Sequence, residues 1–254
     1  MMKIAFITGA TSGIGKAIAV RLAKENYSLI LTGRRAERLV ELKEELESQY
    51  NVKVLILCFD VRIFEHVEKA AASLPDEWKS IDILVNNAGL AAGLDPIHSA
   101  LVSDWDQMID TNIKGLLYVT RVIAPGMLDR KSGHIINLGS IAGRANYPSG
   151  SVYCATKHAV KVLSEGMRMD FLPYGVRVTE IAPGAVDTEF SLVRFKGDKQ
   201  RADLVYKGFT PLVAEDIAEA VFCAISQPAH INLQEILIMP TAQASPTLIH
   251  RENN

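Results

Sequence analysis

Short apolar runs alternate with amphipathic stretches along almost the whole chain, and this alternation limits the folds open to it. The apolar runs, which are typical of strands, cover 3–8, 28–32, 52–59, 81–86, 133–139, 176–181 and 235–240. The stretches with helical spacing of apolar residues cover 14–25, 36–49, 63–74, 103–130, 151–172 and 214–226. Strands without polar alternation are buried on both faces. The pattern therefore predicts an α/β fold, with helices on both faces of a parallel sheet.

The length and composition of the chain fit one globular domain. The 254 residues contain no linker rich in proline, glycine or serine, so we expect a single doubly wound Rossmann-type domain over 1–254. Pro125 falls inside the longest predicted helix, where it is expected to cause a kink or a break. After Pro183 the chain becomes polar, and an irregular segment is expected over about 185–212.

Charge and cysteine content argue against several classes of function. A net charge of −2 gives no general attraction to nucleic acid or to an anionic membrane surface. No apolar stretch approaches the ~18 residues of a membrane-spanning helix, and the N-terminal run lacks the long apolar core of a signal peptide. The three cysteines are scattered and lie at no metal-binding spacing, so we expect a cytoplasmic protein without a metal site.

A glycine-rich turn joins the first predicted strand to the first predicted helix. Such a turn lets the backbone approach a ligand, and the helix N-terminus offers amide groups and positive potential to a pyrophosphate. Its position predicts a dinucleotide site, although its spacing, G-x-x-x-G-x-G, differs from the common G-x-G-x-x-G. The residues expected to hold the cofactor here are Gly9, Thr11, Ser12, Gly13, Ile14 and Gly15.

The end of the second predicted strand indicates which dinucleotide is bound. An acidic residue at this point would bind the ribose 2′-hydroxyl of NAD, whereas arginine accommodates the 2′-phosphate of NADP. The chain has Arg34 and Arg35 here, with Arg38 one turn later, and guanidinium groups suit phosphate. We therefore predict NADP as the cofactor. The alternative is a solvated basic helix start, which the helix dipole mildly disfavours.

A tyrosine and a lysine are spaced one helical turn apart near the start of the predicted helix 151–172. Residues at i and i+4 share a helix face, so Tyr153 and Lys157 point the same way. The ammonium group is expected to lower the pKa of the phenol and make Tyr153 a general acid or base. Alone, the pair indicates no more than a solvated helix face. Ser140 upstream and the nucleotide turn favour a catalytic site.

Together these motifs resemble the short-chain dehydrogenase/reductase family over nearly the whole chain. Asp60 after the third strand, Asn86-Asn87-Ala88-Gly89 after the fourth, Ser140 after the fifth and Pro183-Gly184 after the sixth stand in the family's order. The resemblance implies a seven-stranded parallel sheet with the strand order 3-2-1-4-5-6-7.

The resemblance also implies a catalytic tetrad of Asn112, Ser140, Tyr153 and Lys157. Tyr153 would exchange a proton with the substrate, Ser140 would stabilise charge on the substrate oxygen, and Lys157 would hold the nicotinamide ribose. Asn112 would hold a water linked to Lys157; without the other motifs it would indicate only a bend in a long helix. Further implied cofactor contacts are Asp60, Val61, Asn87, Ala88, Gly89, Tyr153, Lys157, Pro183, Gly184, Val186 and Thr188.

The stretches 74–78, 81–91 and 190–198 resemble the branch of NADP-dependent 3-hydroxy acid dehydrogenases, which act on serine, allo-threonine and related small acids. In this family the segment after the sixth strand, here about 185–212, covers the substrate. A carboxylate substrate requires a cation. The candidates are Ser140 for the hydroxyl and Arg144, Arg194 or Lys196 for the carboxylate, unless these are solvated loop charges. Asp187 is expected to face away from the cofactor phosphates.

Two other functions stay open at this point. A broader carbonyl or 3-oxoacyl reductase would use the same tetrad, and a non-catalytic NADP(H)-sensing regulator would use the same nucleotide turn. The resemblance further implies a homotetramer in which the helices 103–130 and 151–172 pair between subunits, unless their apolar faces are covered within one chain. A small molecule is the expected partner, with neither nucleic acid nor membrane.

Overall fold

The computed structural model describes residues 2–252, which have the architecture that the alternating pattern predicts. Within this range seven parallel strands form one sheet in the order β3-β2-β1-β4-β5-β6-β7, which confirms the predicted order. The strands are β1 (Ile4–Ile7), β2 (Ser28–Gly33), β3 (Val54–Cys58), β4 (Ile81–Asn86), β5 (His134–Leu138), β6 (Arg177–Pro183) and β7 (Glu235–Ile238).

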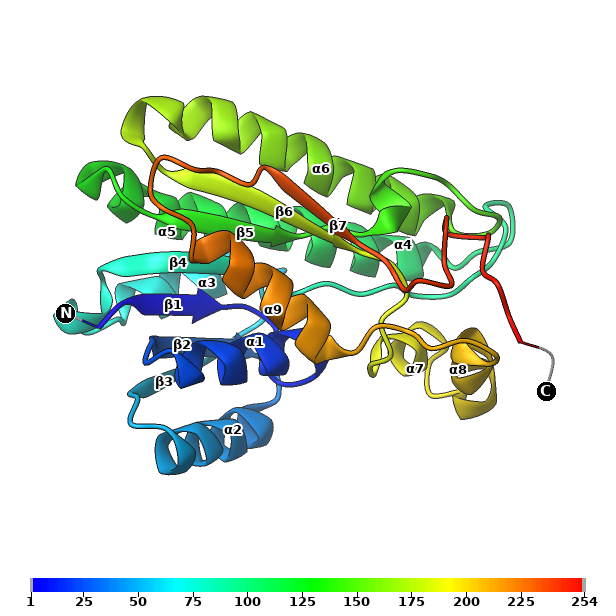
Figure 1. Ribbon diagram of the computed structural model, residues 1–254, viewed down its shortest axis with the longest axis horizontal. Coiled ribbons are helices and arrows are strands. Elements are labelled where there is room, and N and C mark those ends of the chain that lie inside the picture. Colours follow the sequence, from blue (N-terminus) through cyan, green and yellow to red (C-terminus); the bar gives the residue numbers. More distant parts are fainter. Residues whose placement is uncertain (1, 253–254) are drawn as a thin grey trace.

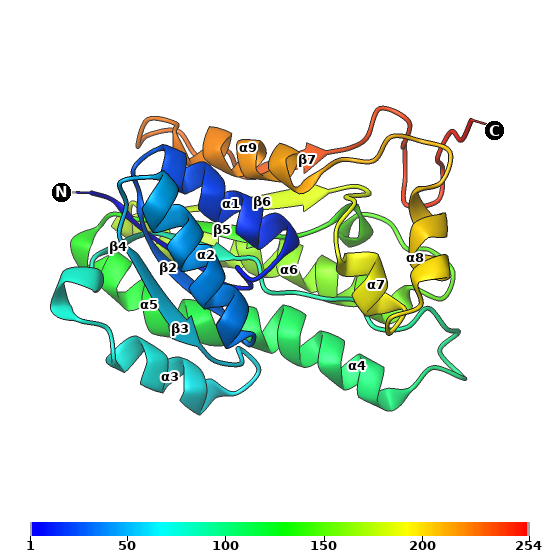
Figure 2. The same ribbon diagram turned by 90° about the horizontal axis from the view of Figure 1, so that it is seen from below.

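Helices lie on both faces of the sheet, with α1, α2 and α9 on one face and α3 to α6 on the other (Figures 1 and 2). The helices are α1 (Gly13–Lys24), α2 (Ala36–Gln49), α3 (Phe64–Ala72), α4 (Val102–Ile109), α5 (Leu116–Arg130), α6 (Ser151–Phe171), α7 (Phe190–Arg194), α8 (Lys199–Tyr206) and α9 (Ala214–Ile225). Shorter turns are η1 (Asp76–Trp78), η2 (Asp110–Gly115), η3 (Ile141–Gly143) and η4 (Leu172–Tyr174).

Two apolar layers hold the sheet between its helices. Successive strand residues face opposite sides, so Ala5 and Ile7 of β1 pack in the layer with α1 and α9, whereas Ile4 and Phe6 pack in the layer with α3, α5 and α6. All four side chains are buried. This burial on both faces explains why the strands are continuous apolar runs in the sequence.

The predicted helix 103–130 is interrupted, but not where proline indicated. Pro125 lies inside α5, and the break is the π-helical turn η2 between α4 and α5. The break coincides with Asn112, whose side chain bonds the backbone of Leu90 on a neighbouring loop. Side-chain interactions that disturb the regular hydrogen-bond ladder are a known cause of such irregularity, and π-turns often mark functional sites.

The segment 185–212 is not irregular as predicted, because it contains α7 and α8. α7 has only five residues and α8 is mostly polar, so neither has a clear apolar period in the sequence. The ends of the segment lie side by side, since Val186 pairs with Leu212 and the Asp187 amide donates to the Leu212 carbonyl at 2.8 Å. We call this segment the excursion; it stands at the end of the sheet toward which the strands run (Figure 2).

The last described residues dock against the same excursion. Arg251 Nη2 donates to the Val205 carbonyl at 3.0 Å, and the Glu252 amide donates to the Gly208 carbonyl at 2.7 Å. The N-terminus lies at the opposite end of the sheet (Figure 1). Within residues 2–252 no helix combines the length and apolarity needed to cross a membrane.

Candidate active site

A cleft of about 560 Å³ opens at the carboxyl edge of the sheet. Parallel strands end at this edge, and the loops that follow them converge there, as expected for a doubly wound sheet. Every residue predicted to contact the cofactor lines the cleft except Gly15 and Arg38. The predicted catalytic and substrate residues that line it are Ser140, Tyr153, Lys157 and Arg194, whereas Asn112, Arg144 and Lys196 do not.

The glycine-rich turn is shaped by close backbone contacts. Gly9 has φ +67°, a conformation that favours glycine. A Cβ on Gly15 would lie against the Gly9 carbonyl oxygen and 2.5 Å from Asn87 Nδ2, so Gly15 packs behind the turn rather than in the cleft. Asn87 Nδ2 fixes the turn by donating to the carbonyls of Thr8 and Gly9 at 2.8 and 3.1 Å.

This turn fits a dinucleotide. Gly13 opens α1, and the first amides of an α-helix have no acceptor within the helix. Gly13 and Ile14, the first residues of this helix, line the cleft together with the hydroxyl-bearing residues Thr11 and Ser12. The result is a concave set of donors suited to a pyrophosphate.

The arginines after β2 form a polar cluster with the turn. Arg35 donates from Nε to Thr11 Oγ1 at 3.0 Å and from Nη2 to Ser12 Oγ at 2.7 Å. Arg35 and Arg38 also share the carboxylate of Glu189, at 3.0 and 2.8 Å. Glu189 was missed in the sequence because its partners lie far away along the chain. Arg38 belongs to this cluster but does not line the cleft.

Asp60, a predicted cofactor contact, is held in place by Arg62, a neighbour that the sequence analysis also missed. Arg62 Nη2 lies 2.6 Å from Asp60 Oδ2, and the Arg62 amide donates to Oδ1 at 3.0 Å. Burial acts to raise the pKa of Asp60, but the hydrogen bonds from Arg62 outweigh it and the pKa is lowered. Asp60 is therefore an ionised group in the cleft lining, and Arg62 holds its carboxylate in place.

The predicted tetrad is buried around the end of β5. Lys157 Nζ donates to the Leu138 carbonyl at 2.7 Å and lies 6.0 Å from the centroid of the Tyr153 ring. Ser140 Oγ accepts from the Ala142 amide at 3.1 Å, which leaves its hydroxyl hydrogen to donate elsewhere. Tyr153, Ser140 and Lys157 thus stand together at the cleft wall.

The prediction that Lys157 lowers the pKa of Tyr153 is wrong for this structure. Burial raises the pKa of Tyr153 above its usual range, reinforced by Tyr147 and opposed by the Ser140 hydroxyl and Arg194. Burial also lowers the pKa of Lys157 to about 8, against the attraction of Glu180. The phenol is therefore protonated at neutral pH, the form needed to donate a proton.

Asn112 lies in η2 with its side chain fully engaged. Its Oδ1 accepts from the Leu90 amide at 2.9 Å, and Nδ2 donates to the Leu90 carbonyl and to Thr156 Oγ1 at 2.8 and 3.0 Å. These bonds connect α6 to the loop after β4. The amide group of Asn112 therefore orders the cleft wall, and a water held by this residue stays a prediction.

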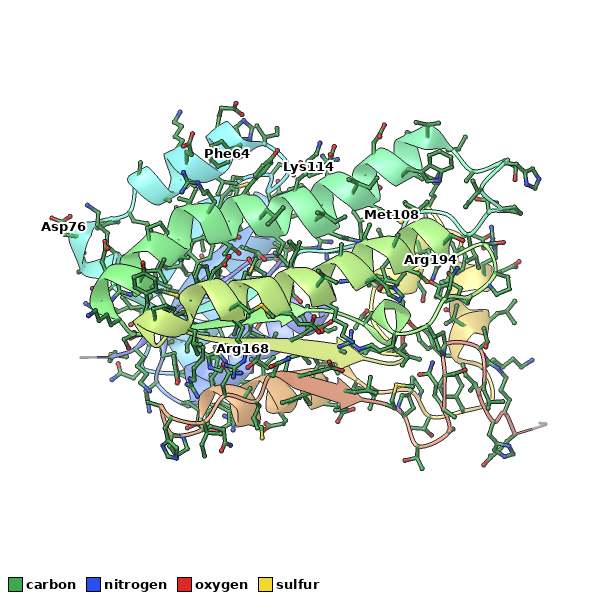
Figure 3. The ribbon with its side chains drawn as sticks, turned by 90° about the horizontal axis from the view of Figure 1, so that it is seen from above. Phe64, Asp76, Met108, Lys114, Arg168 and Arg194 are labelled. Atoms are coloured by element: carbon green, nitrogen blue, oxygen red, sulfur yellow. The ribbon has the colours of Figure 1, made fainter. Side chains whose placement is uncertain are left out.

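Arg194 reaches the cleft from the end of α7. Its guanidinium carbon lies 5.7 Å from the Tyr153 ring centroid and 5.4 Å from that of Tyr147, while Nε donates to the Gly93 carbonyl at 3.1 Å. No carboxylate among residues 2–252 forms a salt bridge with it, which leaves a cation beside the phenol. Figure 3 shows Arg194 close to Met108, and both residues line a smaller hollow next to the cleft.

The other two predicted carboxylate-binding cations have internal partners. Arg144 donates to both oxygens of Glu180, at 2.8 and 2.6 Å, and also pairs with Glu235 at 2.8 Å. Its partners lie on β6 and β7, and Arg144 does not line the cleft. The prediction that Arg144 binds a substrate carboxylate is therefore wrong for this structure. Lys196 is directed to Asp104 at 2.9 Å, with half of its side chain exposed.

Of the two residues Asp187 and Thr188 before α7, only the predicted cofactor contact Thr188 lines the cleft. Thr188 Oγ1 accepts from the amide of Phe190, the first residue of α7, at 3.2 Å. Asp187 is exposed and lies outside the cleft lining, as expected for a carboxylate that would face away from phosphates.

Comparisons with known proteins agree with this geometry. The family model described as short chain dehydrogenase matches residues 3–198. The NADP-dependent 3-hydroxy acid dehydrogenase YdfG of Salmonella typhi is 50% identical over 250 residues, which cover 98% of this chain and 99% of that protein. Sulfoacetaldehyde reductase 2 of Chromohalobacter salexigens is 46% identical over 245 residues, 96% of each chain. The closed form of a serine dehydrogenase complexed with NADP+ superposes with a TM-score of 0.91 at 49% identity, covering 98% of this chain and all of the other.

These matches extend over nearly the full length of the chain and include the cleft. The strand order, the glycine-rich turn and the buried group around Tyr153 occur together in the described residues. The protein belongs to the short chain dehydrogenase family.

Proposed function

We propose that this protein is an NADP-dependent oxidoreductase of small 3-hydroxy acids such as serine or allo-threonine. In this reaction the 3-hydroxyl is oxidised to a carbonyl, or the carbonyl is reduced in the opposite direction. The names of the relatives support this class of substrate. The observation that carries the proposal is the position of Arg194, a cation beside the Tyr153 phenol that can hold an acid while its hydroxyl reaches the phenol.

The chain can hold NADP with groups from several loops. The amides at the start of α1 would bind the pyrophosphate, and Arg34, Arg35 and Arg38 would bind the 2′-phosphate. Lys157 would bind the nicotinamide ribose. When bound, NADP supplies the hydride chemistry that no side chain can perform.

The protein's own contribution is proton transfer and charge stabilisation. In reduction, the protonated Tyr153 phenol gives its proton to the substrate oxygen, and in oxidation it takes that proton back. Ser140 donates its hydroxyl hydrogen to the same oxygen, because its lone pair already accepts from Ala142. Lys157 Nζ is held by the Leu138 carbonyl, 6.0 Å from the centroid of the Tyr153 ring, which leaves its ammonium group beside the proton donor for contact with the nicotinamide ribose.

A second candidate is the reduction of a small aldehyde that carries a sulfonate. The similarity to sulfoacetaldehyde reductase 2 favours this candidate specifically. A sulfonate and a carboxylate both suit a guanidinium, so Arg194 serves either substrate. The broader reductase of 3-oxoacyl esters would not depend on Arg194.

Steady-state assays separate these functions. NADP+ and NAD+ are each paired with serine, 3-hydroxypropionate and an uncharged alcohol of similar size, and NADPH is paired with sulfoacetaldehyde and a 3-oxoacyl ester. We expect the highest kcat/KM for an acid with NADP+. Preference for the ester would favour the broader reductase, and binding of NADPH without turnover of any of these compounds would favour a sensory role.

We further propose a cytoplasmic homotetramer built on α5 and α6. Large apolar side chains on these helices stay exposed in the single chain, including Leu117, Val162 and Met169. Apolar surface of this kind is typical of subunit interfaces. Sedimentation equilibrium tests this assembly, and a monomeric mass would contradict it.

A further inference from the structure

Glu189 joins the excursion to the arginines that would bind the cofactor phosphate. It directly precedes α7, and its carboxylate accepts from Arg35 Nη1 at 3.0 Å and from Arg38 Nη1 at 2.8 and 3.1 Å. A carboxylate on these arginines is unexpected, because a phosphate site normally keeps its cations available for phosphate. Glu189 itself lines the cleft.

Most of the N–H donors of Arg35 are already in use. Nε and Nη2 bind the hydroxyl groups of Thr11 and Ser12, and one hydrogen of Nη1 binds Glu189. Only the second hydrogen of Nη1 has no acceptor, so a phosphate that binds Arg35 through two donors must replace one of these acceptors. Glu189 is the acceptor most opposed to a phosphate, because like charges repel, whereas the hydroxyl groups can donate to it.

Glu189 is ionised in this position. Burial acts to raise the pKa of Glu189, but the hydrogen bonds from Arg35 and Arg38 outweigh it and the pKa is lowered. Arg34, the next cation, has Nη1 4.0 Å from Asp60 Oδ2 and is mostly exposed, so it is not paired with Glu189. The cluster thus carries a fixed negative charge where a dianionic phosphate would bind.

Contacts at both ends of α7 attach the excursion to the rest of the molecule. At the far end of α7, Arg194 and Gly93 exchange two hydrogen bonds, the Gly93 amide donating at 3.0 Å and Arg194 Nε at 3.1 Å. Lys196 pairs with Asp104 of α4 at 2.9 Å. At the start of α7, the corresponding contact is the pairing of Glu189 with Arg35 and Arg38. A change at Glu189 therefore reaches the helix that carries Arg194.

We propose that in the cofactor-free protein Glu189 occupies the binding position of the 2′-phosphate on Arg35 and Arg38, and that the phosphate displaces it. This inference rests on the proposed use of NADP. Glu189 then weakens binding of NADP(H) but not of NAD(H), and the arriving phosphate releases the start of α7. Because coupling between sites is reciprocal, release of Glu189 from the arginines favours the phosphate as much as the phosphate favours that release.

Calorimetric titration of Glu189→Gln tests the proposal without turnover. The ligands are NADPH and NADH, with 2′,5′-ADP and 5′-AMP as the smallest pair that differs by the 2′-phosphate. Removing one charge from a screened cluster should tighten binding of NADPH and 2′,5′-ADP by roughly threefold to tenfold. The dissociation constants of NADH and 5′-AMP should stay within about twofold.

Two control variants make the result specific. Glu219→Gln removes the same charge from an exposed pair with Arg21, away from the cleft, and should leave all four dissociation constants unchanged. Asp104→Asn releases the Lys196 side of the excursion and should not change the ratio between NADPH and NADH.

Three outcomes would overturn the inference. Weaker binding of NADPH by Glu189→Gln would mean that Glu189 orients the arginines for phosphate. Equal changes for all four ligands would mean a general loosening of the excursion. No change for either phosphate-bearing ligand would mean that Glu189 and the phosphate do not meet. If the wild-type protein bound NADH as tightly as NADPH, the proposed cofactor would be wrong, independently of how Glu189→Gln behaves.

Discussion

The two walls of the cleft are built in different ways. The nucleotide wall consists of a turn whose glycines pack against Asn87 and against each other. The substrate wall is the excursion, held by contacts between residues far apart in sequence, such as Lys196 with Asp104 and Arg35 with Glu189. The first wall depends on local backbone shape and the second on charge pairing over long distances. Backbone shape is specified by a short motif, whereas paired charges can be rearranged by a ligand that carries charge.

The largest expected effect is on kcat and follows from a change at Tyr153. Tyr153→Phe removes the proposed proton donor, so we expect kcat to fall by about 10²–10⁴. Phenylalanine keeps the ring in the same buried position, so the Kd for NADPH should change far less than kcat. Stopped-flow turnover and fluorescence titration measure the two quantities separately. Turnover at the wild-type rate would place proton transfer elsewhere.

Arg144→Ala tests whether an arginine near the substrate wall serves the fold alone. The substitution leaves Glu180 as a buried carboxylate without its cation, since Glu180 is 2% exposed. Breaking such a pair should cost about 3–5 kcal/mol in the free energy of unfolding, measured by urea denaturation. The KM for serine should stay the same in the folded variant. A raised KM with unchanged stability would return Arg144 to the substrate site.

The pH dependence of stability tests the burial of Lys157. Burial lowers the pKa of Lys157 to about 8, so between pH 8 and the unfolded value of about 10.4 the unfolded chain binds a proton that the folded chain lacks. The free energy of unfolding then rises with pH across this window. Relative to Lys157→Met, the wild type should gain about 2 kcal/mol between pH 8 and 10.

Urea titrations at both pH values measure this gain. The raised pKa of Tyr153 has the opposite sign, because the folded chain retains that proton longer, but its effect begins only above about pH 10. Parallel pH curves for the wild type and Lys157→Met would mean that Lys157 is solvated.

Arg194→Ala and Lys196→Ala compare two cations of the excursion. Arg194 stands beside Tyr153, and losing a charged hydrogen bond to the substrate should raise the KM for serine about tenfold to a hundredfold. The KM for an uncharged alcohol should change little. Lys196 pairs with Asp104 outside the cleft, so its variant is the matched control. Equal effects of Arg194→Ala on both substrates would remove the carboxylate-binding role.

The smallest effects test the shape of the nucleotide wall. A methyl group on Gly15 would collide with the Gly9 carbonyl and with Asn87, so Gly15→Ala should cost about 1–3 kcal/mol and weaken NADPH binding. Gly166, inside α6, has nothing within 4 Å of the same position. Gly166→Ala should therefore stabilise the chain by about 0.5–1 kcal/mol. Thermal denaturation measures the change in stability of both variants. An equal change for Gly15→Ala and Gly166→Ala would mean that the turn is not tightly packed.

The sequence predicts the features that depend on near neighbours. The strands, the glycine-rich turn and the spacing of Tyr153 and Lys157 are short-range patterns, and the structure brings these residues to one cleft. Features that depend on tertiary contacts were predicted poorly. The pKa of Tyr153 follows from burial, which no local pattern reports.

The arginines give the clearest example of this limit. Arg144 and Arg194 are equivalent candidates in the sequence, yet Arg144 pairs with Glu180 and Glu235 while Arg194 lies beside Tyr153. The partner of each cation is set by the order of the strands and by the path of the excursion. The helices α7 and α8 escaped prediction for a related reason, because contacts with the rest of the molecule and not an apolar period hold them in place.

The placement of the chain ends has a practical consequence for handling the enzyme. The described C-terminal residues pack on the excursion through Arg251 and Glu252, whereas the N-terminus lies at the far end of the sheet (Figure 1). A bead, a dye or a fused protein attached at the C-terminus would disturb α7 and α8, which lie beside the cleft. The same cargo joined in front of Lys3 would leave them undisturbed, so immobilised preparations and biosensors are best tethered there.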